Sequence, residues 1–153
     1  MARISPAPVE QYGPLFGEDA PLRVQIYAQR PEIAEKFVEF GQLLRDNHLL
    51  PARLLELVRI RVAFHNQCRS CMAVRYGYGI EDGLTEDLVC SLEKPDEADD
   101  LTEAEKAALA YADALATDHH RINDAMFERL REHFSDAEIM ELCFHVAFYV
   151  GFG

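Results

Sequence analysis

The residues of this chain best suited to chemistry are two cysteines, Cys68 and Cys71, at the spacing Cys-x-x-Cys. Asn66 and Gln67 interrupt the helical pattern before them, so we expect the pair on the first turn of a new helix. There, two thiols can form a disulfide with little backbone movement, and the free N–H groups of the helix start favour a thiolate. A thiolate attacks an oxidised substrate, and a neighbouring thiol resolves the mixed disulfide or sulfenic acid that results. The pattern therefore indicates thiol–disulfide redox chemistry.

A lone carboxylate, Glu56, lies in the apolar run before the cysteines. In one interpretation it forms an exposed ion pair with Arg59, three residues on, that stabilises the chain by only about a few tenths of a kcal/mol. In the other it is a buried group that exchanges protons with a thiol or a bound water. The helix predicted over 52–65 is apolar on nearly every side, which indicates burial on all sides. We therefore favour the second interpretation.

Zinc binding is the competing use of Cys-x-x-Cys. A structural zinc ion is held by four Cys or His ligands, usually including a second closely spaced pair. The other cysteines, Cys90 and Cys143, are isolated, and His65 alone would leave the shell incomplete. A third interpretation, two buried small apolar side chains, suits a pair directly after a helix break less well. We therefore expect neither a metal ion nor a cofactor.

The composition is that of one folded domain. With 153 residues the chain is long enough for a core of its own and short for two domains. Its formal charge is −12 and its arginines are scattered, so we expect no nucleic-acid partner. The sequence shows neither an apolar leader nor a run of about eighteen apolar residues, so we expect no membrane association. These features favour a cytoplasmic location, where Cys-x-x-Cys is more often catalytic or metal-binding than structural.

The elements that would position the cysteines are all helical. Residues 1–22 hold several prolines and glycines without a period, so we expect an irregular arm there, lying over the domain or over a neighbouring subunit. Over 23–153 apolar residues recur at helical spacing, and capping boxes at Thr102 and Ser135 predict helix starts. The cysteine helix should reach about Tyr78. No stretch alternates long enough for a strand, so we predict an all-α domain with six or seven helices.

These residues resemble the alkyl hydroperoxidase D / carboxymuconolactone decarboxylase family. The similarity lies within about 33–92 and rests on the run LPARLLELVRIRVA at 50–63, on the spacing Glu56-x11-Cys68-x2-Cys71, and on Gly77 near the end of the cysteine helix. It implies an all-helical domain of the alkyl hydroperoxidase D type that assembles as trimers or hexamers. It also implies a peroxidase or disulfide reductase that acts on small hydroperoxides and is re-reduced by a dithiol partner, a lipoyl- or thioredoxin-type protein.

The resemblance also implies roles for the three site residues. Cys71 would attack the peroxide, Cys68 would resolve the intermediate, and Glu56 would relay protons. The residues by themselves equally allow Cys68 to attack first, so the order stays open.

Two positions depart from the family pattern. A histidine usually follows the second cysteine by four residues, but here that position is Arg75, and Ser70 replaces the tyrosine usual between the cysteines. Arginine stays protonated and cannot relay a proton. It could instead stabilise a Cys71 thiolate by its charge or pair with Glu56. His145, on the last helix, is interpreted as a core residue rather than a substitute for the relay histidine.

Two other functions remain open at this point. One is a carboxymuconolactone decarboxylase-like lyase, which would not need the cysteines and would hold an anionic substrate with Arg59 and Arg75. The other is a non-catalytic oligomeric redox sensor that keeps the fold without turnover.

Overall fold

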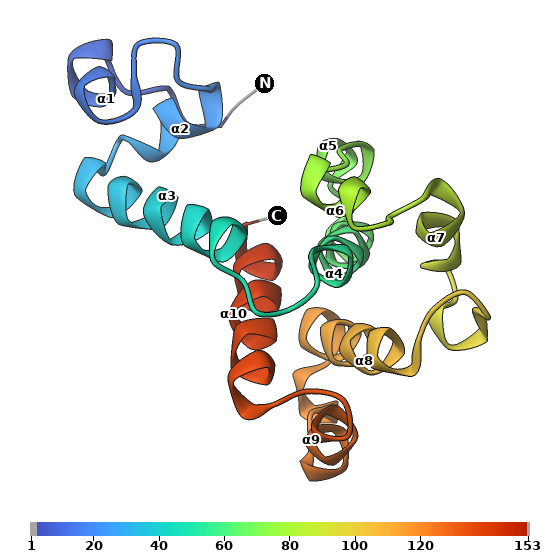
Figure 1. Ribbon diagram of the computed structural model, residues 1–153. Coiled ribbons are helices and arrows are strands. Elements are labelled where there is room, and N and C mark those ends of the chain that lie inside the picture. The colour runs from blue at the N-terminus through green and yellow to red at the C-terminus, as the bar shows by residue number, and fades with distance from the viewer. Residues whose placement is uncertain (1–2, 153) are drawn as a thin grey trace. The chain divides into compact units, whose positions relative to one another are not determined.

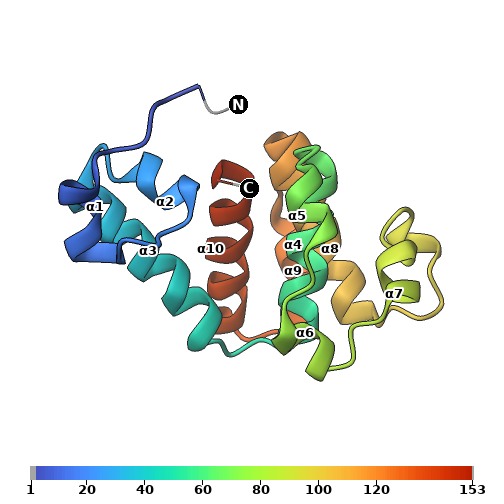
Figure 2. The ribbon, with the colours of Figure 1, turned by 90° about the horizontal axis from the view of Figure 1, so that it is seen from above.

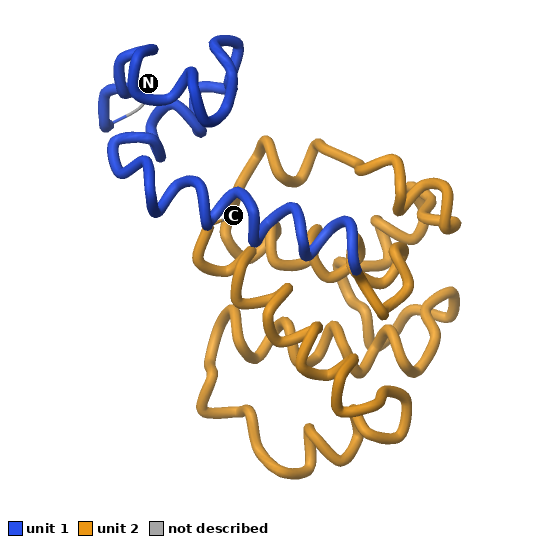
Figure 3. The backbone as a smooth tube through the Cα atoms, turned by 60° about the vertical axis from the view of Figure 1, so that its left-hand side comes forward, with its two compact units in different colours: residues 1–47 blue, residues 48–153 orange. Residues whose placement is uncertain are grey.

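The computed structural model describes residues 3–152, and every regular element in that part of the chain is a helix (Figure 1). The predicted all-α fold is thus confirmed. The chain divides into two compact units, residues 1–47 and 48–153, which are coloured separately in Figure 3 and described here one by one. The helices are α1 (Val9–Phe16), α2 (Leu22–Tyr27), α3 (Pro31–Asp46), α4 (Ala52–His65), α5 (Arg69–Ala73), α6 (Gly77–Glu81), α7 (Glu86–Ser91), α8 (Glu103–Thr117), α9 (Asp124–Arg131) and α10 (Asp136–Phe152), with short 3-10 helices η1 (Pro95–Glu97) and η2 (His119–Arg121).

The first unit contains α1, α2 and α3 around a small apolar cluster that includes Tyr12 and Ala28. The predicted irregular arm over 1–22 is wrong for Val9–Phe16, which is helical. Two of the prolines that suggested irregularity, Pro8 and Pro21, occupy the positions directly before α1 and α2, whereas Pro14 lies inside α1. At a helix start the missing N–H of proline leaves no hydrogen bond unmade.

The second unit is built around α4, and α8, α10 and α6 pack against it (Figure 2). The helix predicted over 52–65 is confirmed with its bounds. Its apolar side chains, among them Leu57, Val58 and Ile60, are buried in the main core with residues of α8 and α10. The capping boxes at Thr102 and Ser135 also form as predicted and start α8 and α10.

Polar side chains fix α8 against α4. Arg53 donates to Glu105 at 2.7 Å, and Arg61 donates two hydrogen bonds, of 2.6 and 2.8 Å, to Asp113. Nε2 of His65 lies 2.7 Å from the same Asp113 carboxylate. Burial disfavours the charged form of Asp113, but the hydrogen bonds from Arg61 and His65 outweigh it and lower the pKa of that carboxyl below its usual value. The charged side chains of a buried helix thus have the partners that their burial requires.

Two details of the sequence prediction are wrong. The cysteine helix does not reach Tyr78: α5 ends at Ala73, and a separate short helix, α6, follows. The helix count exceeds six or seven, because this split and the helices of the first unit add short elements. Among residues 3–152, none of the helices combines the length and the apolar character needed to span a lipid bilayer. A cytoplasmic location and a single domain over 23–153 stay predictions.

Candidate functional site

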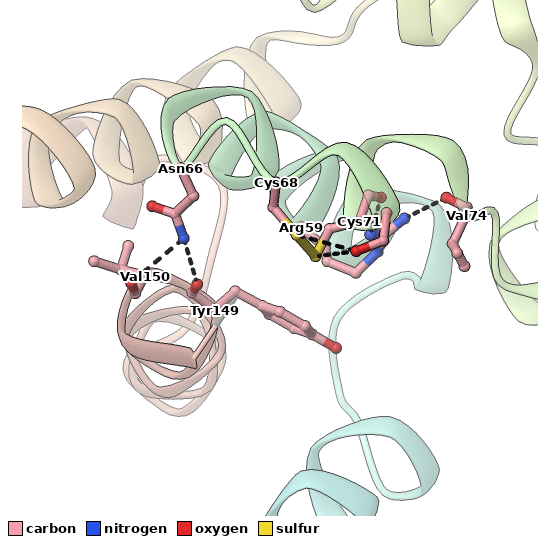
Figure 4. Close-up of a disulfide and its surroundings, with 8 residues drawn as sticks. Arg59, Asn66, Cys68, Cys71, Val74, Tyr149 and Val150 are labelled. Atoms are coloured by element: carbon pink, nitrogen blue, oxygen red, sulfur yellow. Dashed lines mark hydrogen bonds between the residues drawn. A yellow bond between two sulfur atoms is a disulfide. The ribbon is translucent and has the colours of Figure 1, made fainter. Parts of the chain in front are cut away.

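Cys68 and Cys71 are joined by a disulfide, with their Cα atoms 5.3 Å apart (Figure 4). Both side chains are partly exposed, so solvent reaches the pair. Cys68 occupies the position directly before α5, as the sequence suggested. Because α5 has only five residues, few aligned peptide dipoles stand behind that position. The sulfurs are therefore accessible, and their reactivity depends on neighbours from other elements.

A tight turn at the end of α4 positions Cys68. Gln67 adopts a left-handed backbone with φ 52°, which is uncommon for a residue other than glycine. Its N–H donates to Phe64 O, and the N–H of Cys68 donates to Ala63 O, which together form a Schellman motif. Asn66 anchors this turn to α10, because its side-chain amide donates to Tyr149 O at 3.0 Å (Figure 4).

Beneath the disulfide lies a buried ion pair. Arg59 donates from Nε and Nη2 to the two carboxylate oxygens of Glu56, at 2.6 and 2.7 Å, and the side chains are 2% and 0% exposed. The Arg59 guanidinium also lies 4.9 Å from the centre of the Tyr76 ring. Burial by itself would lower the pKa of Arg59, but the hydrogen bond to Glu56 raises it above its usual value. The ion pair between Glu56 and Arg59, which the sequence analysis considered as an exposed pair, therefore forms inside the protein.

The ion pair shapes the chain that carries the cysteines. Arg59 donates to the carbonyl of Cys71 at 2.7 Å and to the carbonyl of Val74 at 2.7 Å. Glu56 in turn accepts a hydrogen bond of 2.9 Å from the N–H of Tyr76. In a continuous helix the Cys71 carbonyl would bind the N–H four residues on. Here buried side chains satisfy these backbone groups instead, which explains why α5 stops short of the predicted Tyr78.

Gly79 lets α6 approach the ion pair closely. A Cβ atom at this position would lie 2.8 Å from Cγ and 2.9 Å from Cβ of Glu56. Next to it, Tyr78 stacks on Tyr76 with ring centres 5.5 Å apart, and its hydroxyl is buried without a hydrogen-bond partner in the described part of the chain. Burial, followed by the charge of Glu56, raises the pKa of Tyr78, so this phenol stays protonated.

Arg75 occupies the position of the missing relay histidine but does not contact Glu56. Its guanidinium forms an ion pair with Glu86, at 3.0 Å from Nε, and donates to the carbonyl of Met72 at 2.6 Å. The suggested pairing with Glu56 is therefore wrong, because Arg59 takes that place from within α4. These contacts let Arg75 close the end of α5 and tie it to the first residue of α7.

Ser70 lies between the two sulfurs, and the sequence analysis noted it only as a departure from the family. Its hydroxyl oxygen is 3.5 Å from the sulfur of Cys68 and 4.0 Å from that of Cys71. Its position between the cysteines was the available signal, since a hydroxyl can donate a hydrogen bond to a thiolate. The backbone contacts of Arg59 had no such signal, because they depend on how the chain folds back over α4.

His145 is buried in the core of the second unit, as interpreted from the sequence. It is 1% exposed, and its Nε2 atom lies 3.0 Å from the carbonyl of Leu55. Its Nδ1 atom is buried and has no hydrogen-bond partner within residues 3–152. Burial lowers the pKa of His145 to about 4, which leaves the ring neutral at physiological pH. Elsewhere in the described chain, no group of three or more His, Cys, Asp or Glu is arranged to hold a metal ion.

Comparison with known proteins identifies the family. Residues 31–114 match the carboxymuconolactone decarboxylase family. The chain belongs to this family. The uncharacterized protein YdfG of Bacillus subtilis is 30% identical over 121 residues, which cover 78% of this chain and 82% of YdfG. The uncharacterized protein Rv2313c of Mycobacterium tuberculosis is 40% identical over 92 residues, 60% of this chain but 32% of Rv2313c. The chain thus spans about a third of the length of that relative.

Solved structures share the fold of this family member. The debrominase Bmp8 superposes with a TM-score of 0.79 and 19% identity over 99% of this chain and 86% of Bmp8. ATU0492 of Agrobacterium tumefaciens, a protein of unknown function and a candidate antioxidant defence protein AhpD, superposes with a TM-score of 0.70 and 27% sequence identity. The match covers 82% of this chain and 86% of ATU0492. The AhpD core of an uncharacterized peroxidase-related protein from Ralstonia eutropha superposes with a TM-score of 0.66 and 21% sequence identity. The match covers 97% of this chain and 86% of that one. The predicted resemblance to the alkyl hydroperoxidase D / carboxymuconolactone decarboxylase family is confirmed.

The close approach at Gly79 predicts a difference between two glycines of the same short helix. Gly79→Ala should lower the free energy of unfolding by about 1–3 kcal/mol, because its Cβ collides with a buried side chain that cannot move away. Gly77→Ala is the matched control, since its Cβ would meet nothing within 4 Å. Urea unfolding of both variants measures the difference. Equal stabilities would show that α6 does not press on Glu56 as described.

The buried His145 predicts a component of acid sensitivity. Its pKa of about 4 in the folded protein lies below the value of 6.5 for a free histidine, so unfolding takes up a proton between these two values. The stability gained from the neutral ring is complete above pH 6.5 and is lost as the pH falls toward 4. The loss of unfolding free energy between about pH 7.5 and 4.5 should therefore be about 2–3 kcal/mol smaller in His145→Gln. Parallel pH profiles of the two proteins, measured by urea unfolding, would contradict this.

Proposed function

We propose that this protein is a thiol-dependent oxidoreductase that cycles Cys68 and Cys71 between a dithiol and a disulfide while reducing small hydroperoxides. The disulfide itself carries the proposal. It joins residues only three apart, and such a short loop restricts the unfolded chain little, so loop closure gives it a small stabilising effect. The disulfide is also partly exposed, and Arg59 fixes the backbone next to it by a hydrogen bond to the carbonyl of Cys71. A redox role accounts for such a bond better than a structural role.

The reaction divides into two steps at the sulfur atoms. A cysteine thiolate attacks an oxygen of the hydroperoxide, so that an S–O bond forms, the O–O bond breaks, and the alkoxide leaves and takes a proton from solvent. The second thiol then attacks the sulfenic sulfur, which forms the disulfide and releases water. A dithiol partner, which we propose to be a lipoyl- or thioredoxin-type protein, returns two electrons and two protons to regenerate the thiols.

The contacts of Glu56 favour a positioning role over the proton relay expected from the sequence. Both of its carboxylate oxygens are engaged, one by Arg59 and the other by Arg59 and the N–H of Tyr76. Ser70 supports thiolate formation at Cys68, the nearer sulfur, whereas Arg59 fixes the backbone of Cys71. We leave the attacking cysteine open between these two.

The alternative functions make different demands on the arginines. A lyase that binds an anionic substrate without the cysteines would need Arg59 and Arg75 to be available. Arg59 is buried and paired with Glu56, and Arg75 is paired with Glu86, so these contacts favour the redox reaction. A redox sensor would use the same disulfide without turnover. Assembly into trimers or hexamers belongs to the proposal as well, on the basis of family membership.

Peroxide consumption by the reduced protein tests the proposal. We expect tert-butyl hydroperoxide to be consumed in many turnovers when dihydrolipoamide is supplied, and we expect Cys68→Ser and Cys71→Ser each to reduce the rate to that of the uncatalysed reaction. Cys90→Ser is the matched control, because Cys90 is a free, exposed cysteine of the same unit and should not affect the rate.

Peroxide consumption, together with an assay for decarboxylation, separates the three functions. Consumption of one equivalent of peroxide per protein, with no further turnover, would indicate a sensor and contradict the enzymatic proposal. An unchanged rate in both cysteine variants would also contradict it. A lyase is detected by release of carbon dioxide from a lactone acid that does not depend on either cysteine.

A further inference from the structure

A second concave site lies between α8 and α9, which contact each other in the second unit. Its volume is about 420 Å³, within the range of small-molecule pockets. None of its lining residues belongs to the disulfide site. They come from α8, from η2, from the residue that caps α9 and from α9 itself: Ala107, Ala110, Arg121, Asn123, Ala125, Met126 and Arg129.

The wall of this cavity is apolar because α8 presents alanines there. Ala107 and Ala110 are three residues apart and share one face of the helix, and their short side chains leave space that a longer residue would fill. Met126 of α9 lines the same cavity with a flexible apolar side chain. Such a wall suits the hydrocarbon part of a ligand.

Two guanidinium groups give the cavity its charge. Arg121 is exposed and forms no ion pair within residues 3–152. Among residues 3–152, the one ion pair of Arg129 is a long contact of 3.9 Å to Glu103, and the same Glu103 lies closer to Lys106, at 3.2 Å. Most other arginines of this unit bind a carboxylate closely, as Arg53 does at 2.7 Å. In a chain of net charge −12, this cavity thus has one cation without an ion pair in the described chain and one that is only loosely paired, and both can bind an anion.

We propose that this cavity binds a small amphipathic carboxylate. The carboxylate lies between Arg121 and Arg129, whose planar guanidinium groups match its two oxygens, and the hydrocarbon part lies against Ala107, Ala110 and Met126. Glu103 competes for Arg129 and gives it up when the ligand binds, keeping its contact with Lys106. The proposal is independent of the redox function, because it uses none of the residues of the disulfide site.

Calorimetric titration with octanoate tests the proposal on the whole 153-residue chain. We expect one saturable site, at least about tenfold weaker binding to the double variant Arg121→Gln/Arg129→Gln, and similar weakening in Ala110→Phe, whose ring fills the cavity. Arg131→Gln is the matched control, since Arg131 lies on α9 outside the cavity and pairs with Asp136, and it should bind as the wild type does. Circular dichroism confirms that each variant keeps its helices.

Three results would overturn the proposal. Octanol binding as tightly as octanoate would remove the role of the cations. Binding that the double variant and Arg131→Gln weaken equally would show a general charge effect. Inorganic phosphate displacing octanoate at equal concentration would show an anion site that ignores the apolar wall. Peroxide turnover measured on the same variants should be unchanged, which separates this result from a failure of the redox proposal.

Discussion

The buried ion pair of Glu56 and Arg59 is the constraint on which the candidate site depends. Removing two charges from water costs several kcal/mol for each, so their remaining hydrogen-bonding capacity must also be satisfied. The protein meets this requirement with backbone groups of the segment that carries the cysteines: the carbonyls of Cys71 and Val74 and the N–H of Tyr76. The end of α5, the separate α6 and the close approach at Gly79 all follow from this arrangement.

Charged side chains of α4 position two different parts of the second unit. Arg61, with Asp113 and His65, fixes α8 at one side of the helix, while the Glu56–Arg59 pair organises the chain that returns over it. A central helix that is apolar on nearly all sides can hold these charges because each has a partner supplied by another element or by the next helical turn. The sulfur atoms stay accessible above this rigid base, and the proposed chemistry takes place there.

The sequence predicted what depends on local pattern. The bounds of α4, the caps at Thr102 and Ser135, and the pairing of Cys68 with Cys71 rest on spacings of a few residues. The split after Ala73 could not be predicted, because the segment up to Tyr78 has a helical pattern, and the arginines that take its carbonyls, Arg59 and Arg75, reach them only in the folded chain. The partner of Arg75 could not be predicted either, because the turn before α7 brings Glu86 into contact with it.

Amide hydrogen exchange in Arg59→Lys tests the central claim most directly. Lysine keeps the positive charge but lacks the planar fork that reaches Glu56 and two carbonyls at once. If the ion pair holds the cysteine segment, exchange over 72–78, including the Tyr76 N–H, should rise about tenfold or more while α8 keeps its protection. Unchanged exchange over 72–78 would contradict the account, as would an equal rise in α8.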